Sequence, residues 1–165
     1  MKTIITILTV LLLFISIQTN EEPVPHKPTN VKLIVTKFTP QSLINYLKYK
    51  NVKHKEIVYA QALIETGNFT SNIFKQNNNL FGMKYVGKYR YSRPTYAIGE
   101  QHNHALYLNW VESVQDYILW QNMHKKTPIK TQQQYLELLR RTYAEDSSYV
   151  SVIKYLLKKD TVKWI

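Results

Sequence analysis

Residues 57–67 (IVYAQALIETG) are apolar around almost the whole circumference of a helix. A helix that is hydrophobic on all sides is buried, so the rest of the chain has to pack around this one. The segment closes with Gly67, the type of residue that commonly ends a helix in the left-handed conformation. The pattern therefore predicts a buried helix with Gly67 at its C-terminal cap.

Glu65 is the charged residue of this segment and lies near its C-terminal end. On a helix it shares a face with Ala62, Gln61 and Val58. Burial removes water from a carboxylate, favours its neutral form and raises its pKa. A carboxyl group that stays protonated near neutral pH is suited to general acid catalysis. The alternative is an ordinary Glu at a helix end, which reaches solvent or caps a neighbouring element.

Four motifs carry a resemblance to a known family. Residues 60–67 (AQALIETG) and 78–84 (NNLFGMK) resemble the paired signature of the bacterial glucosaminidase family, which hydrolyses peptidoglycan. The resemblance continues through residues 107–117 (YLNWVESVQDY) and ends in residues 143–149 (YAEDSSY), similar to the family's Tyr-Ala-Thr-Asp-Pro-x-Tyr element. It extends over residues 40–159, with the four motifs in the family's order.

The resemblance implies a lysozyme-like fold, that is, a mainly α (α+β) domain with a small β-rich lobe beside the cleft. It places Glu65 at the family's general acid position. It also matches Tyr143 to the tyrosine of the family's last motif, as a second catalytic residue. Further residues of the motifs and of the lobe are expected to bind the substrate: Asn79, Phe81, Tyr96, Glu100 and Tyr149.

The second catalytic group is harder to assign. Cleavage of a glycosidic bond ordinarily uses two carboxylates. Some family members carry another glutamate in the β-lobe, but the matching residues here, 93–97, read RPTYA, which leaves Glu100 as a substitute. Alternatively, a 2-acetamido group on the substrate supplies the nucleophile and the Tyr143 hydroxyl orients it. Asp146 is expected to cap the last helix rather than to act as a base.

Capping residues predict the other helices. Thr39 before Pro40 starts one helix, and Asn109 with Glu112 starts another. A further helix begins at Thr131, and the last begins at Asp146 or Ser147, which gives about five helices in total. Residues 69–79 are polar and are expected to form a loop at the edge of a cleft. Alternating tyrosines and basic residues between positions 80 and 108 predict two or three short antiparallel strands.

The N-terminal segment differs from the rest of the chain. Residues 1–20 have the lysine and the short apolar run of a secretory signal peptide, with an uncleaved anchor as the alternative. Residues 21–39 contain several prolines and are expected to be a tether, followed by one catalytic domain at residues 40–165. The protein is therefore expected to be exported to the periplasm, the cell envelope or the exterior. It contains no cysteine, which excludes disulfides and thiol catalysis.

The chain is strongly basic, with 22 Lys and Arg against 11 Asp and Glu. Such a charge favours an anionic partner, here the glycan strands of peptidoglycan with attraction to an anionic envelope surface rather than nucleic acid.

His102 and His104 form a His-x-His pair, but no third ligand lies near them for a catalytic zinc. We therefore expect no metal, no cofactor and a monomer.

These observations predict an exported endo-β-N-acetylglucosaminidase that cuts peptidoglycan after N-acetylglucosamine. Two alternatives stay open. One is a non-catalytic glycan-binding module on the same fold, suggested by the missing second carboxylate. The other is an endoglycosidase that acts on chitobiose-type glycans or chitin.

Overall fold

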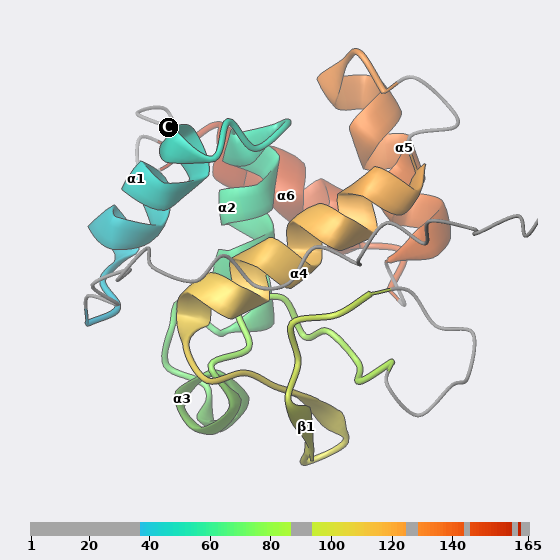
Figure 1. The fold of residues 1–165 in the computed structure, drawn as a ribbon. Coiled ribbons are helices and arrows are strands. Elements are labelled where there is room, and N and C mark those ends of the chain that lie inside the picture. Colours follow the sequence, from blue (N-terminus) through green and yellow to red (C-terminus); the bar gives the residue numbers. More distant parts are fainter. Residues whose placement is uncertain (1–36, 87–93, 125–128, 144–145, 160–161, 163–165) are drawn as a thin grey trace, which may run out of the picture. The chain divides into compact units, whose positions relative to one another are not determined.

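The computed structural model describes residues 37–86, 94–124, 129–143, 146–159 and 162 (Figure 1). Their elements, in chain order, are α1 (Pro40–Tyr49), α2 (Lys55–Glu65), α3 (Asn72–Asn77), β1 (Gly99–Gln101), β2 (His104–Leu106), α4 (Trp110–Met123), α5 (Gln132–Thr142) and α6 (Tyr149–Leu157). This part of the chain is mainly helical with one small sheet, which confirms the predicted fold class. No helix within it has the length and apolar character needed to cross a membrane.

The predicted signal peptide and most of the predicted tether, up to residue 36, lie outside the described residues. Residues 87–93, within the region expected to form strands, also lie outside them. Phe38, at the end of the predicted tether, is described and packs edge-on against Phe74 and Trp110, with ring centroids 4.7 and 5.7 Å away. Aromatic packing in the domain therefore includes residue 38.

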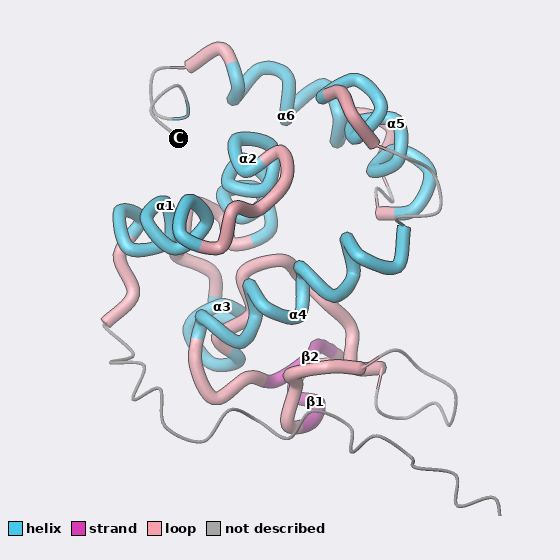
Figure 2. The backbone as a smooth tube through the Cα atoms, turned by 45° about the horizontal axis from the view of Figure 1, so that its top comes forward, coloured by secondary structure: helices cyan, strands magenta, loops and turns pink. Residues whose placement is uncertain are grey.

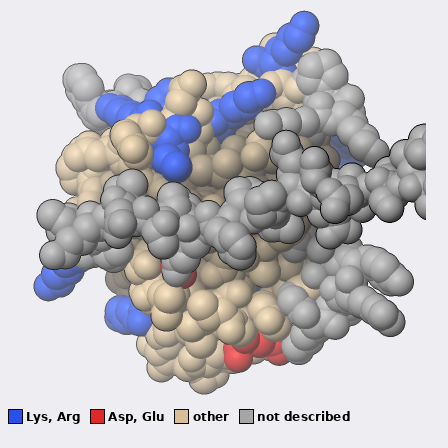
Figure 3. All heavy atoms as spheres, in the orientation of Figure 1, with Lys and Arg blue, Asp and Glu red and all other residues tan. Residues whose placement is uncertain are grey.

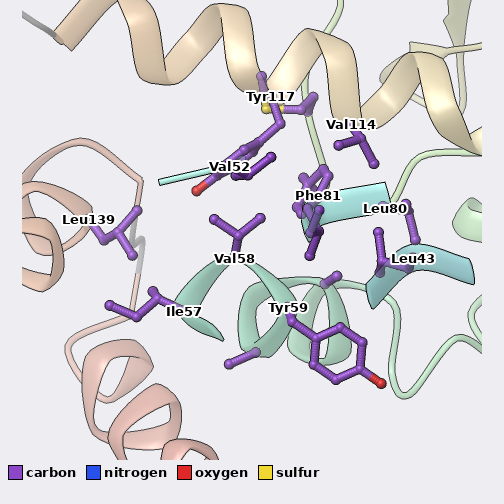
Figure 4. Packing of buried hydrophobic residues seen from close by; sticks show 14 of the residues in the cluster. Leu43, Val52, Ile57, Val58, Tyr59, Leu80, Phe81, Val114, Tyr117 and Leu139 are labelled. Carbon is purple, nitrogen blue, oxygen red and sulfur yellow. The ribbon is translucent and has the colours of Figure 1, made fainter. Parts of the chain in front are cut away.

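Helix α2 is the buried helix that the sequence predicts. Residues 57–62 are all buried, including the polar Gln61. Figure 2 shows α2 at the centre, with α1, α4 and α6 around it. Val58 points from α2 toward Phe81 and Tyr117 in the core, and those two rings lie 4.3 Å apart (Figure 4). This packing fixes α2, and with it the position of Glu65 at its last turn.

The end of α2 is a Schellman motif. Gly67 has a φ of +54° and donates its N–H to the carbonyl of Ile64 at 3.1 Å. The next N–H, of Asn68, reaches back to the carbonyl of Leu63 at 2.8 Å. The predicted glycine cap is confirmed, and it ends the helix directly after Glu65.

The predicted N-caps of three other helices are also confirmed. Thr39 and Thr131 each form a full capping box, with Ser42 and Gln134. Asn109 accepts the N–H of Glu112 at 3.2 Å. The Glu112 carboxylate differs from the expected box, since it accepts the N–H of Leu108 at 3.0 Å.

Two local predictions are wrong. Residues 69–79 are not all loop, because Ser71 caps the short helix α3 and Phe74 anchors that helix in the core. The last helix does not start at Asp146 or Ser147, since its N-cap residue is Ser148. Asp146 instead accepts the N–H of Ser148 at 2.7 Å, which makes an Asx-type turn ahead of the helix.

Strands β1 and β2 form an antiparallel hairpin, with Glu100 opposite Ala105. The connecting residues His102 and Asn103 both have positive φ, at +52° and +60°, as a type I′ turn requires. The buried Asn79 fastens this hairpin to the preceding loop, because its amide donates to the carbonyls of Met83 and Ala105 at 2.9 and 3.0 Å. The β-lobe is therefore small, and side-chain hydrogen bonds to its backbone hold it in place.

Candidate active site

Glu65 lies beside a hollow of about 610 Å³. Its walls come from the end of α2, the loop after α3, strand β2, helix α4, the end of α5 and the start of α6. The residues that line it are Ile64, Glu65, Phe81, Gly82, Met83, Lys84, Val86, His104, Trp120, Thr142, Tyr143, Asp146 and Tyr149. The hollow thus joins residues from three of the four sequence motifs.

Gly82 allows the close approach of the loop to Glu65. Its φ is +63°, a conformation that strains residues with a side chain. A Cβ atom at this position would lie 2.7 Å from Oε2 of Glu65, well inside van der Waals contact. Two features therefore require glycine at position 82: the positive φ of its backbone and the close approach of the Glu65 carboxylate.

The other oxygen of Glu65 is held from α6. The Tyr149 hydroxyl donates to Oε1 of Glu65 at 2.8 Å, and the Gln61 amide donates to the same hydroxyl at 3.2 Å. Burial, and then the negative charge of Glu65, raise the pKa of Tyr149, so this hydroxyl stays protonated at any ordinary pH. The half-buried Glu65 is therefore fixed at one oxygen by a permanent donor.

Tyr143, at the end of α5, also lines the hollow. Its hydroxyl donates to the carbonyl of Phe81, and its ring packs edge-on against Trp120 at 5.2 Å. Burial, followed by the charge of Glu65, raises the pKa of Tyr143. Because the Tyr143 proton is already donated to the protein, the hydroxyl oxygen is left to accept a hydrogen bond from a ligand.

Comparison with known proteins gives the family of the chain. The family model described as mannosyl-glycoprotein endo-beta-N-acetylglucosaminidase matches residues 41–161, most of the chain. The chain belongs to the glucosaminidase family. Its members are glycoside hydrolases.

A solved structure supports the fold. The catalytic domain of the autolysin Auto from Listeria monocytogenes superposes with a TM-score of 0.51 at 21% identity, over 78% of this chain and 88% of that domain. At this identity the likeness concerns the fold. A search of curated protein sequences finds no significant match.

The hollow beside Glu65 is lined by four of the seven predicted site residues, namely Glu65, Phe81, Tyr143 and Tyr149. The other three are not part of its lining. Asn79 is 1% exposed, and both ends of its amide bond the backbone around it. Tyr96 is 44% exposed, and the exposed Glu100 lies on β1. Asn79 therefore holds the backbone near the hollow in place. Binding of substrate by Tyr96 or Glu100 stays a prediction.

Asp146 is the second acidic residue in the lining. It is exposed, and hydrogen bonding from Ser148 lowers its pKa. The sequence favoured a capping role, and Asp146 does bond the turn before α6. Its place in the hollow depends on how the chain folds back onto α2, which its local sequence does not reveal.

Sequence reasoning did not assign Lys84, His104 and Trp120 to the site. Lys84 belongs to the second motif and so carried a signal, whereas Trp120 lies just after the third motif. His104 was considered only as a metal ligand. Among the residues that the structure describes, no cluster of three or more His, Cys, Asp or Glu side chains is placed to hold a metal.

Proposed function

We propose that this protein is an exported endo-β-N-acetylglucosaminidase that cleaves the β-1,4 bond after N-acetylglucosamine in peptidoglycan, with Glu65 as general acid. One observation carries the proposal: the Glu65 carboxyl is fixed by Tyr149 at Oε1 and by the bare backbone of Gly82 beside Oε2. A carboxyl group held in one orientation at the wall of a hollow is suited to protonate a leaving oxygen. Export rests on the N-terminal apolar segment.

Tyr143 gives the substrate-assisted route a physical basis. Its oxygen accepts the N–H of the 2-acetamido group and directs the carbonyl oxygen of that group at the anomeric carbon. Glu65 then gives its proton to the glycosidic oxygen as the C–O bond breaks, and the acetamido oxygen forms a cyclic oxazolinium ion with that carbon. Water opens the ring, and the Glu65 carboxylate takes up the proton that water releases, which restores the acid.

The lining of the hollow favours an anionic glycan. The Lys84 ammonium donates to the carbonyl of Asn103 at 3.2 Å and lies 3.4 Å from Nε2 of His104. Nδ1 of His104 faces the carbonyl of His102 at 2.8 Å, so Nδ1 carries the ring hydrogen and Nε2 accepts from Lys84. An ammonium held in this way has a further N–H to offer to a carboxylate of a muramic acid or of its peptide.

Lys84→Met tests this preference. We expect the variant to raise KM for peptidoglycan fragments several-fold while KM for neutral chitin oligosaccharides stays as in the wild type. The control that removes the same charge is Lys75→Met, because Lys75 lies on α3 and is not part of the lining. Equal effects of Lys84→Met on both substrates would remove the argument for an anionic glycan.

Digestion of purified peptidoglycan, followed by reduction and mass spectrometry, tests the proposal itself. We expect fragments that end in reduced N-acetylglucosamine from the wild type and from the control Glu137→Gln, a partly exposed glutamate on α5 that does not line the hollow. Glu65→Gln should release none. Fragments that end in reduced N-acetylmuramic acid would instead identify a muramidase. Binding without products in every variant would identify the alternative, a glycan-binding module.

A further inference from the structure

A continuous chain of hydrogen bonds runs through the core from Glu65 to Gln121 on α4. We call it the internal hydrogen-bond chain, and its members are Glu65, Tyr149, Gln61, Tyr117, Tyr135 and Gln121. Gln61 and Tyr117 are fully buried, and Tyr135 is 2% exposed. Polar groups buried so deeply are kept only when they are hydrogen-bonded, so the six side chains form one connected unit.

The direction of each bond follows from the atoms involved. The Gln121 amide donates to the Tyr135 oxygen at 2.6 Å and to the carbonyl of Lys53 at 3.1 Å. The Tyr117 hydroxyl donates to the Gln61 carbonyl oxygen, which leaves the Tyr135 hydroxyl to donate to Tyr117 across 2.6 Å.

The remaining two bonds continue in the same sense. The Gln61 amide donates to the Tyr149 oxygen, and the Tyr149 hydroxyl donates to Oε1 of Glu65. Every donor in the internal hydrogen-bond chain therefore points toward Glu65. Successive bonds that point one way polarise one another, so the chain strengthens its last donor.

The direction of the internal hydrogen-bond chain does not change at ordinary pH, because its tyrosines do not lose their protons. Burial raises the pKa of Tyr117, of Tyr135 and of Tyr149. Each hydroxyl keeps its single hydrogen, and each has a fixed acceptor. The chain is therefore a static array of donors that ends at one oxygen of the catalytic carboxyl.

We propose that Gln61, Tyr117, Tyr135 and Gln121 are positioning residues, which hold the Tyr149 hydroxyl on Oε1 and so assign the acidic proton of Glu65 to Oε2, the oxygen beside Gly82. The proposal rests on the proposed function, in which Glu65 is the acid. Under this proposal, residues as distant as Gln121 on α4 help to determine which oxygen of Glu65 carries the proton. None of these four residues lines the hollow.

The charged and titratable groups around Glu65 come from several elements. Tyr149 and Asp146 face the hollow from α6 and the turn before it, and Tyr143 faces it from the end of α5. Lys84 faces the hollow from the loop after α3, and His104 faces it from β2. Because the internal hydrogen-bond chain donates to the carboxylate, it favours the ionised form, and cutting the chain should shift the titration of Glu65 to higher pH.

The test is a carboxyl titration that needs no catalysis. Full-length protein labelled with ¹³C at the glutamate carboxyl carbons is titrated by NMR, and the Glu65 signal is assigned by its absence in Glu65→Gln. We expect Tyr117→Phe and Gln61→Leu to move the Glu65 midpoint to higher pH, with the larger shift for Gln61→Leu, which is nearer to Tyr149. In the same variants kcat should fall about 3- to 10-fold with KM unchanged, as the loss of one modest hydrogen bond implies.

Tyr59→Phe is the matched control. Tyr59 is a buried tyrosine on α2, the helix that carries Gln61 and Glu65, but it is not a member of the internal hydrogen-bond chain. It should change neither the midpoint nor kcat. If Tyr117→Phe does not fold, Tyr135→Phe and Gln121→Met cut the chain further from Glu65 and should give smaller shifts in the same direction. Midpoints equal to wild type in every folded variant would overturn the proposal. A shifted midpoint in a protein that cuts no glycan would refute the proposed function and leave the positioning role standing.

Discussion

The two carboxylates of the hollow, Glu65 and Asp146, have opposite environments. Glu65 is half-buried at the end of a core helix, and it accepts a hydrogen bond from a side chain more than eighty residues away in sequence. Asp146 is exposed, and its bonding partner is the N–H of its near neighbour Ser148. Environments that differ in this way separate the roles of two carboxylates. This difference supports our proposal that Glu65 transfers the proton, while Asp146 supports the turn before α6.

Apart from replacement of Glu65 itself, the largest effect is expected from crowding its carboxyl group. Gly82→Ala places a methyl group 2.7 Å from Oε2 and has to shift either the carboxyl or the loop. Since a displacement of about 1 Å can cost a hundredfold in rate, we expect kcat to fall about 100-fold. Gly99→Ala is the matched control, because a Cβ at Gly99 meets nothing within 4 Å. If Gly82→Ala retains wild-type kcat, the geometry of Glu65 is not essential.

Removal of the donor to Glu65 should have an intermediate effect. Tyr149→Phe deletes the hydroxyl that contacts Oε1 and leaves the Gln61 amide without its acceptor. We expect kcat to fall about 10-fold, the value of one hydrogen bond to a charged group. The alkaline limb of the pH–rate profile should move to higher pH, because a bond that favours the ionised carboxylate is lost. An alkaline limb that stays in place would show that Tyr149 does not act on the acid.

The smallest effect is expected at Asp146. Asp146→Asn keeps an oxygen for the Ser148 N–H but removes the charge, so activity should stay within a few-fold of wild type. The pKa of Asp146 is lowered in the fold, so its charge stabilises the fold above its ordinary titration range and ceases to do so as the pH falls through the lowered pKa. The difference in Tm between Asp146→Asn and wild type should therefore be seen at neutral pH and disappear in acid. A loss of activity as large as that of Glu65→Gln would make Asp146 the second catalytic carboxylate.

Much of the fold could be predicted because its signals are local. The all-round apolar pattern of α2 and the caps at Thr39, Asn109 and Thr131 each depend on a few adjacent residues. Helix α3 was missed because its residues are mostly polar and Phe74 is the one apolar side chain that it buries. Local signals thus predicted the elements better than their exact ends.

The site was less accessible from the sequence, because its contacts are long-range. The fixed orientation of Glu65 depends on Tyr149, and the internal hydrogen-bond chain joins α2 to α4, α5 and α6. Gln61 looked like a lone polar residue on an apolar helix, and nothing nearby in the sequence indicates its partners. Asn79 was expected to meet substrate, but its motif position does not reveal that the backbone uses both ends of its amide.

The most direct test of Glu65 as the general acid compares two leaving groups. Wild type and Glu65→Gln are assayed on a peptidoglycan oligosaccharide and on the matching glycoside of an activated phenol, whose departure needs no proton. The account predicts that Glu65→Gln loses about 10²- to 10⁴-fold in kcat on the oligosaccharide and far less on the aryl glycoside. Equal losses on both substrates would contradict it.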